Sequence, residues 1–399
     1  MTSTSTSTST SASASTAKSQ RIRVGIIGAG EVTQVVHLPT LAYLFDRYVV
    51  TALCDVSAEA VAYSASKWGI ARTYTSSAEL VASPDVDLVL IANSDEYHVS
   101  CALDAARAGK HVFIEKPMAL THRQAQAVHD AAHQHGVKIY VGYMRRYAPA
   151  FDEFRRLLRD CGPIRHAIVK DIVGPNAFFV AQSATEPRKF VNDIPADAAE
   201  DKARLARDIL VEALGDDRAA SPRLAAVYRL LGSLGSHDLS FMREALGGPP
   251  TRCTSAFASH DGQFISAQFE YHGRRTTQAS SADPKHEQQP PFSVLYTTGI
   301  HNVGVFESFL EVYTDDRILR IDIDTPYVKG LPLRVTVKEN DERGIYSERI
   351  VRTSYKDAYT AQFEQLHDAI TTGTDLKTTP ADAAQDLVVF DMIMQKLEA

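Results

Sequence analysis

Between Ile22 and Gly142 the chain alternates short apolar runs with amphipathic stretches, and this alternation constrains the fold more than any other feature. The apolar runs are rich in β-branched residues, as in strands buried on both faces, and the stretches between them have the length and periodicity of helices. We therefore predict an α/β fold with a doubly wound parallel sheet. The expected strands are Arg21–Ile27, Tyr48–Cys54, Val86–Ala92, Val112–Lys116 and Lys138–Gly142, and the expected helices include Ala58–Trp68, Ser77–Ser83, Val99–Ala108 and His122–His135.

A glycine-rich turn directly follows the first expected strand. Gly28-Ala29-Gly30-Glu31-Val32-Thr33 approximates GxGxxG, with threonine in the third glycine position. Gly28 allows the tight turn, and Gly30 lets the backbone approach a pyrophosphate, whose charge the following helix N-terminus favours. The third glycine usually serves helix–strand packing, so we expect Thr33 to alter packing more than phosphate contact. We assign Gly28, Gly30, Glu31 and Val32 to dinucleotide binding.

The second expected strand ends in an acid, Asp55. An acid at this place accepts hydrogen bonds from the hydroxyls of the adenosine ribose and repels a 2′-phosphate, so we predict NAD as the cofactor, with NADP less favoured. The alternative is that Asp55 caps the helix that begins near Ala58.

Glu115 and Lys116 stand where a buried strand runs out, just before Pro117. In an open α/β sheet the carboxyl ends of the strands face the ligand crevice. Lys116 is then able to hold or pass a proton beside a cofactor, because a lysine pKa moves readily under desolvation or near another charge. The alternative is a structural lysine that snorkels from the strand end.

Composition and charge exclude several classes of function. The chain has 399 residues, which suits two domains, and a net charge of -7 without a basic stripe, which argues against nucleic-acid binding. It lacks an apolar run of about 20 residues, so we expect no membrane span. Four cysteines without CxxC spacing and histidines without HExxH spacing predict a reducing compartment, taken as cytoplasmic, and no metal site. Residues 1–20, rich in Ser and Thr, are predicted to be a disordered tail.

Several further motifs occur in order along the chain. They are His37-Leu38-Pro39, Glu115-Lys116-Pro117, Gly142-Tyr143-Met144-Arg145-Arg146-Tyr147 and Gly235-Ser236-His237-Asp238. With Gly28-Ala29-Gly30 and Asp55, they resemble the glucose–fructose oxidoreductase / inositol dehydrogenase family of NAD(P)-dependent oxidoreductases, and the resemblance covers residues 21 to 399. It implies a Rossmann domain over 21–145 and, over 146–399, a substrate and oligomerisation domain with an open, mainly antiparallel sheet. It also implies a homodimer or homotetramer, with final helices that pack back on the first domain.

The second half fits this organisation. Strands are expected at Ile164–Ile172, Phe264–Tyr271, Val303–Tyr313, Ile318–Ile323 and Leu333–Glu339. Asp193–Asp217, charged and helix-prone, and the loop Ala279–Pro291 look irregular. The stretch 174–225 is longer than the resemblance implies. It is interpreted either as a lid over the substrate mouth or as a surface excursion.

The resemblance implies a catalytic histidine at His237, with an aspartate four residues earlier on the same helix face. Here Ser233 takes that place, and Ser240 takes the place of another acid. Asp238 points about 100° around the helix and is a poor substitute. Our hypothesis is that His237 takes the proton of a substrate hydroxyl while Lys116 polarises the same oxygen and helps to relay the proton. The alternative for His237 is an ordinary interior histidine.

Other assignments follow from the same resemblance. Glu115 is expected at the nicotinamide ribose, and Asn93 and His98 at the border of the cofactor. The substrate-contact candidates are Tyr143, Arg146, Tyr147, Ser233 and His237.

Three functions stay open at this point. The first is an NAD(P)-dependent dehydrogenase of a sugar, inositol or related polyhydroxy compound. The second uses transient oxidation with retained NAD for glycoside cleavage or epimerisation. The third is a non-catalytic dinucleotide-binding regulator, which the presence of Lys116 and His237 disfavours and Ser233 favours.

Overall fold

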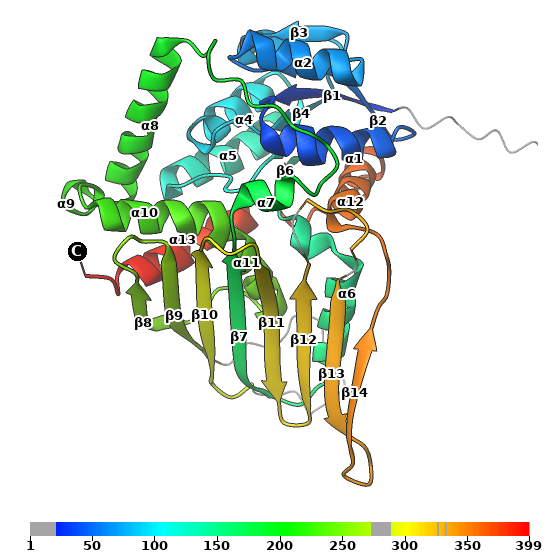
Figure 1. Cartoon of the computed structure of the whole chain (residues 1–399), viewed down its shortest axis with the longest axis vertical. Coiled ribbons are helices and arrows are strands. Elements are labelled where there is room, and N and C mark those ends of the chain that lie inside the picture. Colours follow the sequence, from blue (N-terminus) through cyan, green and yellow to red (C-terminus); the bar gives the residue numbers. More distant parts are fainter. Residues whose placement is uncertain (1–20, 273–288, 325–326, 332, 399) are drawn as a thin grey trace, which may run out of the picture.

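The computed structural model describes residues 21–272, 289–324, 327–331 and 333–398 (Figure 1). The predicted tail at 1–20 and most of the loop predicted at 279–291 lie outside these residues. The described residues form two sheets, one of six strands and one of eight. Figure 1 shows the first sheet and its helices above the second, with the long strands of the second sheet running side by side below.

The first sheet is parallel throughout, with the strand order β3-β2-β1-β4-β5-β6. The predicted doubly wound parallel sheet is therefore confirmed. Its strands are β1 (Ile22–Ile27), β2 (Tyr48–Cys54), β3 (Arg72–Tyr74), β4 (Leu88–Ile91), β5 (His111–Ile114) and β6 (Ile139–Val141). Its helical segments are η1 (Thr33–His37), α1 (Leu38–Tyr43), α2 (Ala58–Trp68), α3 (Ser77–Ala82), η2 (Asp95–Tyr97), α4 (His98–Arg107) and α5 (His122–His135).

Both faces of this sheet are buried because alternate strand residues enter opposite cores. Val89 and Ile91 of β4 pack with α3, α4 and α5, whereas Leu88 and Leu90 pack with α1 and α2. Local signals set the helix ends: Ser57 accepts a hydrogen bond from the Ala60 N–H at the start of α2.

The second sheet has the strand order β14-β13-β12-β11-β7-β10-β9-β8 and is antiparallel except where β7 pairs with β10. Its strands are β7 (Ile164–Val173), β8 (Arg252–Ala258), β9 (Phe264–Tyr271), β10 (Phe292–Ile300), β11 (Phe306–Thr314), β12 (Arg317–Ile323), β13 (Arg334–Asn340) and β14 (Tyr346–Val351). The mainly antiparallel second sheet is thus confirmed, although β11 begins later than predicted. The sequence did not predict β8, β10 and β14, in which Ser, Thr and charged residues interrupt the apolar alternation.

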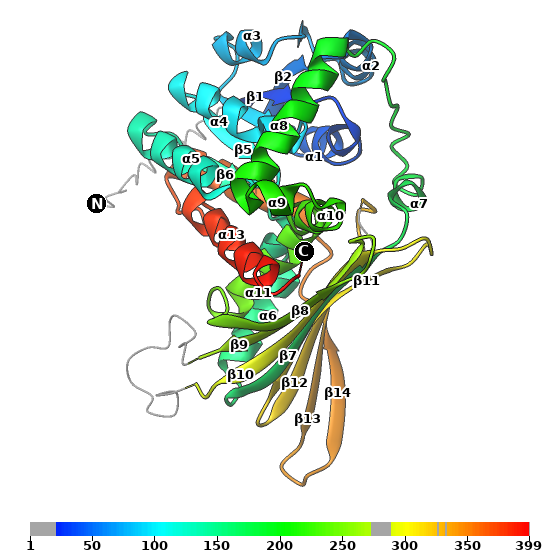
Figure 2. The ribbon, with the colours of Figure 1, turned by 90° about the vertical axis from the view of Figure 1, so that its left-hand side faces the viewer.

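Helices cover one side of the second sheet (Figure 2). α6 packs on β12 and β13, α11 on β7, and α13 on β8. α12 packs against α1 and η3. Its Phe363 also stacks on Phe113 of β5, with ring centres 5.0 Å apart. The segments are η3 (Met144–Tyr147), α6 (Pro149–Arg159), α10 (Pro222–Leu230), η4 (Leu231–Gly235), α11 (Ser236–Leu246), α12 (Ala358–Thr372) and α13 (Pro380–Met394).

The long stretch 174–225 contains α7 (Asn176–Val180), α8 (Ala196–Leu214) and α9 (Asp216–Ala219) before α10 begins. The helix-forming tendency predicted for Asp193–Asp217 is confirmed, and the irregularity predicted for it is not, because α8 is a continuous helix of 19 residues. Between α7 and α8 the chain runs past α1 to α2 (Figure 2). The extended part of this insertion is therefore bonded to the first domain.

All four cysteines are buried and free. The residues that the structure describes hold no group of three or more His, Cys, Asp or Glu side chains placed to bind a metal ion. Across the same residues, no helix combines the length and the apolar character that crossing a bilayer requires.

Candidate active site

The carboxyl end of β5 positions Glu115 and Lys116 through the turn that follows. His98, at the start of α4, lies with Nδ1 2.8 Å from the Pro117 carbonyl oxygen and Nε2 3.2 Å from the Asn93 carbonyl oxygen. The ring thus bridges the ends of β4 and β5. Both ring nitrogens face backbone carbonyls, and the place of His98 at the border of the cofactor stays a prediction.

Lys116 reaches across to the helix that carries the predicted histidine. Its ammonium donates a hydrogen bond of 2.7 Å to the Ser233 carbonyl oxygen. Ser233 lies in η4, a π-helical turn, and such turns occur frequently at functional sites. Gly232 permits the approach, since a Cβ there would lie 2.7 Å from Leu120 Cδ2. Burial lowers the pKa of Lys116, against the opposing charge of Glu115.

His237 follows η4 at the start of α11 and is half-buried. Burial lowers the pKa of His237 well below its usual value, and the charges of Lys116 and Arg145 lower it further. The imidazole is therefore neutral near pH 7. Its Nδ1 is buried and has no hydrogen-bond partner among the described residues. A neutral imidazole with a free nitrogen is suited to accept a proton.

The two serines at the positions of expected acids supply no charge. The Ser233 side chain is exposed, with its hydroxyl 3.5 Å from the Leu230 carbonyl oxygen. The Ser240 hydroxyl donates to the His237 carbonyl oxygen at 3.1 Å. Ser233 thus contributes its backbone carbonyl to Lys116, which the sequence did not predict.

The glycine-rich turn has the shape that a dinucleotide requires. Gly28 has a φ of +105°, and a Cβ there would lie 2.5 Å from the Ala92 carbonyl oxygen, so only glycine fits. A Cβ on Gly30 would meet nothing within 4 Å, so the space above it is open. Thr33 donates its hydroxyl to the Gly28 carbonyl oxygen at 2.6 Å and braces the turn from below.

Asp55 lies at the tip of β2 beside this turn. Its Oδ2 accepts from the Ala29 N–H at 2.7 Å and its Oδ1 from the Ser57 N–H at 3.0 Å. The N-cap of α2 is Ser57, so Asp55 supports the helix start without being its cap. Asp55 thereby joins the glycine turn to α2.

The side chains of Glu31, Val32 and Asn93 surround the same edge. Glu31 accepts a hydrogen bond from Asn176 of α7 and lies 3.3 Å from the Lys189 ammonium. Val32 packs with an apolar cluster that includes Val180 of α7. Asn93 places Nδ2 3.5 Å from Cys101 Sγ, and its Oδ1 is buried without a partner among the described residues.

Glu115 is held by a buried histidine of the first helix. His37 Nε2 lies 2.9 Å from Glu115 Oε1, and the His37 side chain is fully buried. Burial alone would raise the pKa of Glu115, but the contact with His37 and the charge of Lys116 outweigh it, so the pKa is lowered. Glu115 therefore presents a carboxylate beside Lys116.

Three predicted substrate contacts lie elsewhere. Tyr143, Arg146 and Tyr147 are almost completely buried at the junction with α12 and α13. The Tyr143 hydroxyl donates to Asp386, Arg146 pairs with Glu244 and Asp382, and the Tyr147 hydroxyl lies 2.8 Å from Thr378 Oγ1. Protein groups already use the polar atoms of these three side chains, and their contact with a substrate stays a prediction.

Arg145, which the sequence analysis did not select, faces the other way. It is buried, and its Nη1 donates to Asp171 of β7 at 2.8 Å, to Asp238 and to Ser308 at 3.3 Å. Burial and the nearby Asp171 raise the pKa of Asp238 well above its usual value, despite the opposing charge of Arg145. Asp238 therefore keeps its proton to a higher pH than an ordinary aspartate does. An acid in the interior of the strand Ile164–Ile172 was the one available signal for this cluster.

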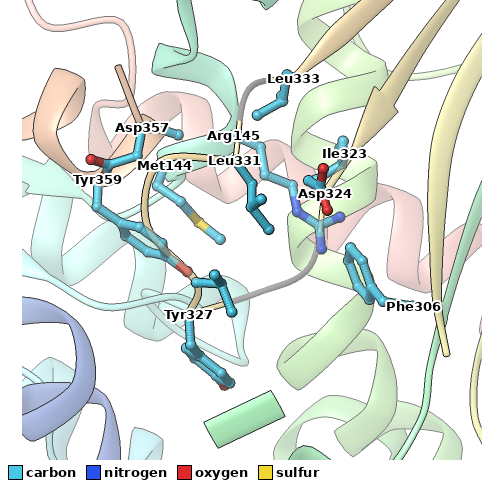
Figure 3. A pocket seen from close by; sticks show the side chains of 12 residues that line it. Met144, Arg145, Phe306, Ile323, Asp324, Tyr327, Leu331, Leu333, Asp357 and Tyr359 are labelled. Carbon is cyan, nitrogen blue, oxygen red and sulfur yellow. The ribbon is translucent and has the colours of Figure 1, made fainter. Parts of the chain in front are cut away.

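A cavity opens beside Arg145 (Figure 3). Figure 3 shows the Arg145 side chain extending between Leu331 and Asp324 towards Phe306, with Tyr359 and Tyr327 across the space. Tyr327 and Tyr359 also lie near Glu115, because its charge contributes to the raised pKa of each phenol. The cavity thus extends from the second sheet towards the end of β5.

The sequence of the first domain matches a known family. Residues 22–143 match the family described as "Oxidoreductase family, NAD-binding Rossmann fold". Inositol 2-dehydrogenase of Salmonella typhimurium is 33% identical over 145 residues, which cover 36% of this chain and 43% of that protein. Inositol 2-dehydrogenase 3 of Saccharopolyspora erythraea is 32% identical over 171 residues, covering 41% and 50%. The match thus spans about half the length of these relatives.

Solved structures share the fold of this chain. An aldose–aldose oxidoreductase from Caulobacter crescentus, complexed with glycerol, superposes with a TM-score of 0.67 at 20% identity, covering 94% of this chain and 97% of that one. A 3-ketoreductase from Actinomadura kijaniata, in complex with NADP and TDP-benzene, gives a TM-score of 0.67 at 16% identity, covering 94% and 98%. At these identities the likeness establishes the fold.

Proposed function

We propose that this protein is an NAD(P)-dependent oxidoreductase that transfers hydride between nicotinamide and a secondary alcohol of a sugar, inositol or related polyhydroxy compound. The observation that carries the proposal is the meeting of Lys116 and His237 at the carboxyl edge of the first sheet, through the hydrogen bond from Lys116 to Ser233. The open space above Gly30 and the unpartnered Oδ1 of Asn93 fit a dinucleotide along the same edge.

The nicotinamide ring, when bound, supplies or accepts the hydride. His237, neutral because its pKa is lowered, takes the hydroxyl proton of the alcohol. Lys116 donates a hydrogen bond to the same oxygen and stabilises the charge that develops there. The negative charge of the Glu115 carboxylate, which lies 2.9 Å from His37, favours the charged form of Lys116.

A polyhydroxy substrate suits the polar groups around these two residues. Arg145 Nε, Asp171 Oδ1 and His237 Nδ1 are buried without hydrogen-bond partners among the described residues. Several hydroxyl groups on one small molecule satisfy such a set, because each is both donor and acceptor. The relatives named inositol 2-dehydrogenase and the glycerol-complexed oxidoreductase support this substrate class.

The test is a Lys116→Ala variant, with Lys110→Ala as the matched control from the other end of β5. Lys110 donates to the carbonyls of Ser83 and Val86, away from the site. Wild type and control should bind NAD and form NADH with at least one member of a panel of sugars, inositols and glycosides. Lys116→Ala should keep NAD binding and lose turnover. Full activity in Lys116→Ala would refute the assignment, and wild-type binding without turnover would favour the regulator.

A second function, transient oxidation with retained NAD, is favoured by residues 183–193, which are bonded to the glycine turn through Gln34. A segment in this place slows the exchange of a dinucleotide. Isomerised or cleaved product in the presence of bound NAD alone, without NADH release, would support the second function over a dehydrogenase.

We further propose a homodimer or homotetramer in the cytoplasm. Phe257 of β8 and Leu295 of β10 are exposed on the side of the second sheet that no described helix covers, and apolar residues of this kind mark subunit interfaces. Light scattering of the purified protein measures the oligomeric state. A monomer at all concentrations would refute the proposed homodimer or homotetramer.

A further inference from the structure

The segment between α7 and α8, residues 183–193, forms a strap across the cofactor edge of the first domain. The Gln34 side chain holds its centre: Gln34 Oε1 accepts from the Arg188 N–H at 2.9 Å, and Nε2 donates to the Arg188 carbonyl oxygen at 2.9 Å. The same Nε2 donates to the Ala29 carbonyl oxygen at 2.8 Å. One amide therefore ties the strap to the glycine-rich turn.

The strap then follows α2. Lys67 donates to the Thr185 carbonyl oxygen at 2.6 Å, and the Arg188 guanidinium lies 4.9 Å from the centre of the Tyr63 ring. Phe190 contacts the same ring, with centroids 5.5 Å apart. Contacts on both sides of the β2–α2 turn place the strap directly over it.

Asp193, at the end of the strap, occupies the start of α2. Its Oδ1 accepts from the Ser57 hydroxyl at 2.7 Å and its Oδ2 from the Glu59 N–H at 2.9 Å. Ser57 Oγ also accepts from the Ala60 N–H at 3.0 Å, and the Ser57 N–H is used by Asp55. The donors of this turn are thus committed to protein groups, and two carboxylates, Asp55 and Asp193, stand side by side on it.

This arrangement bears on the difference between NAD and NADP. The end of β2 is where a Rossmann domain meets the 2′ position of the adenosine ribose, and proteins that accept a 2′-phosphate offer it positive groups or free N–H donors there. Here the free donors are taken, and a second negative charge lies beside Asp55. The two cations nearby already have protein partners: the Lys67 ammonium donates to the Thr185 carbonyl, and the Arg188 guanidinium stacks on Tyr63.

We propose that Asp193 is a specificity-determining residue: the strap delivers its carboxylate to the place that a 2′-phosphate would occupy and so selects NAD over NADP. The inference rests on the proposed function, since it assumes that the first domain binds a nicotinamide dinucleotide. Asp55 alone favours the ribose diol, and Asp193 adds repulsion and removes the N–H donor of Glu59. The insertion thus acts on cofactor choice, at the opposite end of the dinucleotide from the chemistry.

The experiment compares the Kd values of NAD and NADP for wild type, Asp193→Asn, Asp193→Glu and Asp197→Asn. Asp193→Asn keeps an acceptor for Ser57 or Glu59 but loses the charge, so NADP binding should tighten about tenfold while the Kd of NAD stays within about twofold. Asp193→Glu keeps the charge and should keep the NAD preference. Asp197, an exposed acid at the start of α8 bonded to its neighbour's N–H, provides the matched control and should change neither Kd.

The outcomes separate this inference from the proposed function. An unchanged NADP-to-NAD ratio in Asp193→Asn overturns the inference and leaves the proposed function standing. A wild type that binds both dinucleotides equally has the same meaning. Weakening of both cofactors in parallel shows that Asp193 only fixes the strap and also overturns it. Binding of neither dinucleotide by wild type refutes the proposed function, and the inference falls with it.

Discussion

Arg145 and Arg146 are adjacent in η3 and both are buried, yet they serve opposite regions of the molecule. Arg146 turns to the junction with α13, where Nε pairs with Glu244 and Nη1 with Asp382. Arg145 turns to the cavity and uses Nη1 for Asp171 and Asp238, while its Nε has no partner among the described residues. Burial does not distinguish the two side chains. Their hydrogen bonds distinguish them, because a cluster whose donors all have protein partners needs no ligand, whereas a cluster with an unpartnered donor has room for one.

Replacing Arg146 should have the largest effect on stability. Removal of one partner from a buried ion pair costs about 3–5 kcal/mol. Glu244 keeps Arg155 and Asp382 keeps Arg243, so we expect the lower end, about 3 kcal/mol, for Arg146→Met. Urea unfolding of the wild-type protein and the Arg146→Met variant measures this loss of unfolding free energy. Arg156→Met, which removes exposed pairs on α6, should leave the midpoint unchanged. A wild-type midpoint in Arg146→Met would break the assignment of this cluster to structure.

Replacing Arg145 should cost activity more than stability. Burial raises the pKa of Asp238, so the loss of Arg145 leaves less uncompensated negative charge than two ordinary carboxylates would. A charged hydrogen bond to substrate contributes about 1.5–3 kcal/mol, so kcat/KM of Arg145→Met should fall about tenfold to a hundredfold once a substrate is known. The smaller loss of unfolding free energy than in Arg146→Met is the second half of the prediction. Wild-type kcat/KM would group Arg145 with Arg146.

The same pair of arginines marks where prediction from sequence stops. Lys116, Asp55 and the glycine turn were located because each directly follows a buried strand, and strand ends in a parallel sheet share one edge. His237 was placed through resemblance. The direction of each side chain in Met144–Tyr147 is a different matter, since a 3₁₀ turn separates neighbours by about 120° and tertiary contacts decide which faces the site.

Partners that are distant in sequence were also beyond reach. Asp171 lies on β7 and Asp238 on α11, and only the packing of the second sheet against η3 brings them to Arg145. The path of the strap had no local signal either, because its anchors, such as Gln34 with Arg188 and Ser57 with Asp193, join residues more than a hundred positions apart. The helical character of α8 was visible in its residues, whereas the place where it docks was not.

The two clusters should respond to pH with opposite signs. The pKa of Asp238 is raised in the folded state, so its contribution to stability is complete below the unfolded value near 3.9 and is lost as pH rises through the folded value. The pKa of Asp382 is lowered, against its burial, by Arg146 and Arg243, so its contribution is present above the unfolded value and is lost as pH falls.

Denaturation between about pH 2 and about pH 8, in steps of about one unit, distinguishes these signs. Asp238→Asn keeps the shape of the protonated acid. Its free energy of unfolding should therefore rise relative to that of wild type as pH rises, by up to about 1.4 kcal/mol per pH unit. Asp382→Asn should have a lower free energy of unfolding than wild type across the neutral range, and the difference should disappear at the acid end. Parallel curves for the two variants would remove the distinction between the clusters.

The smallest predicted effect is on the titration of His237. Burial is the main cause of its lowered pKa, and the charges of Lys116 and Arg145 add to it. Arg145→Met removes one positive neighbour, so the pKa should rise part of the way towards the ordinary value near 6.5. The chemical shift of the His237 Cε1 proton, followed against pH by NMR, measures the change. Arg155→Met, which removes a cation from the junction cluster, should leave it unchanged. Equal shifts in both variants would mean that the field at His237 comes from the whole domain rather than from the unsaturated cluster beside it.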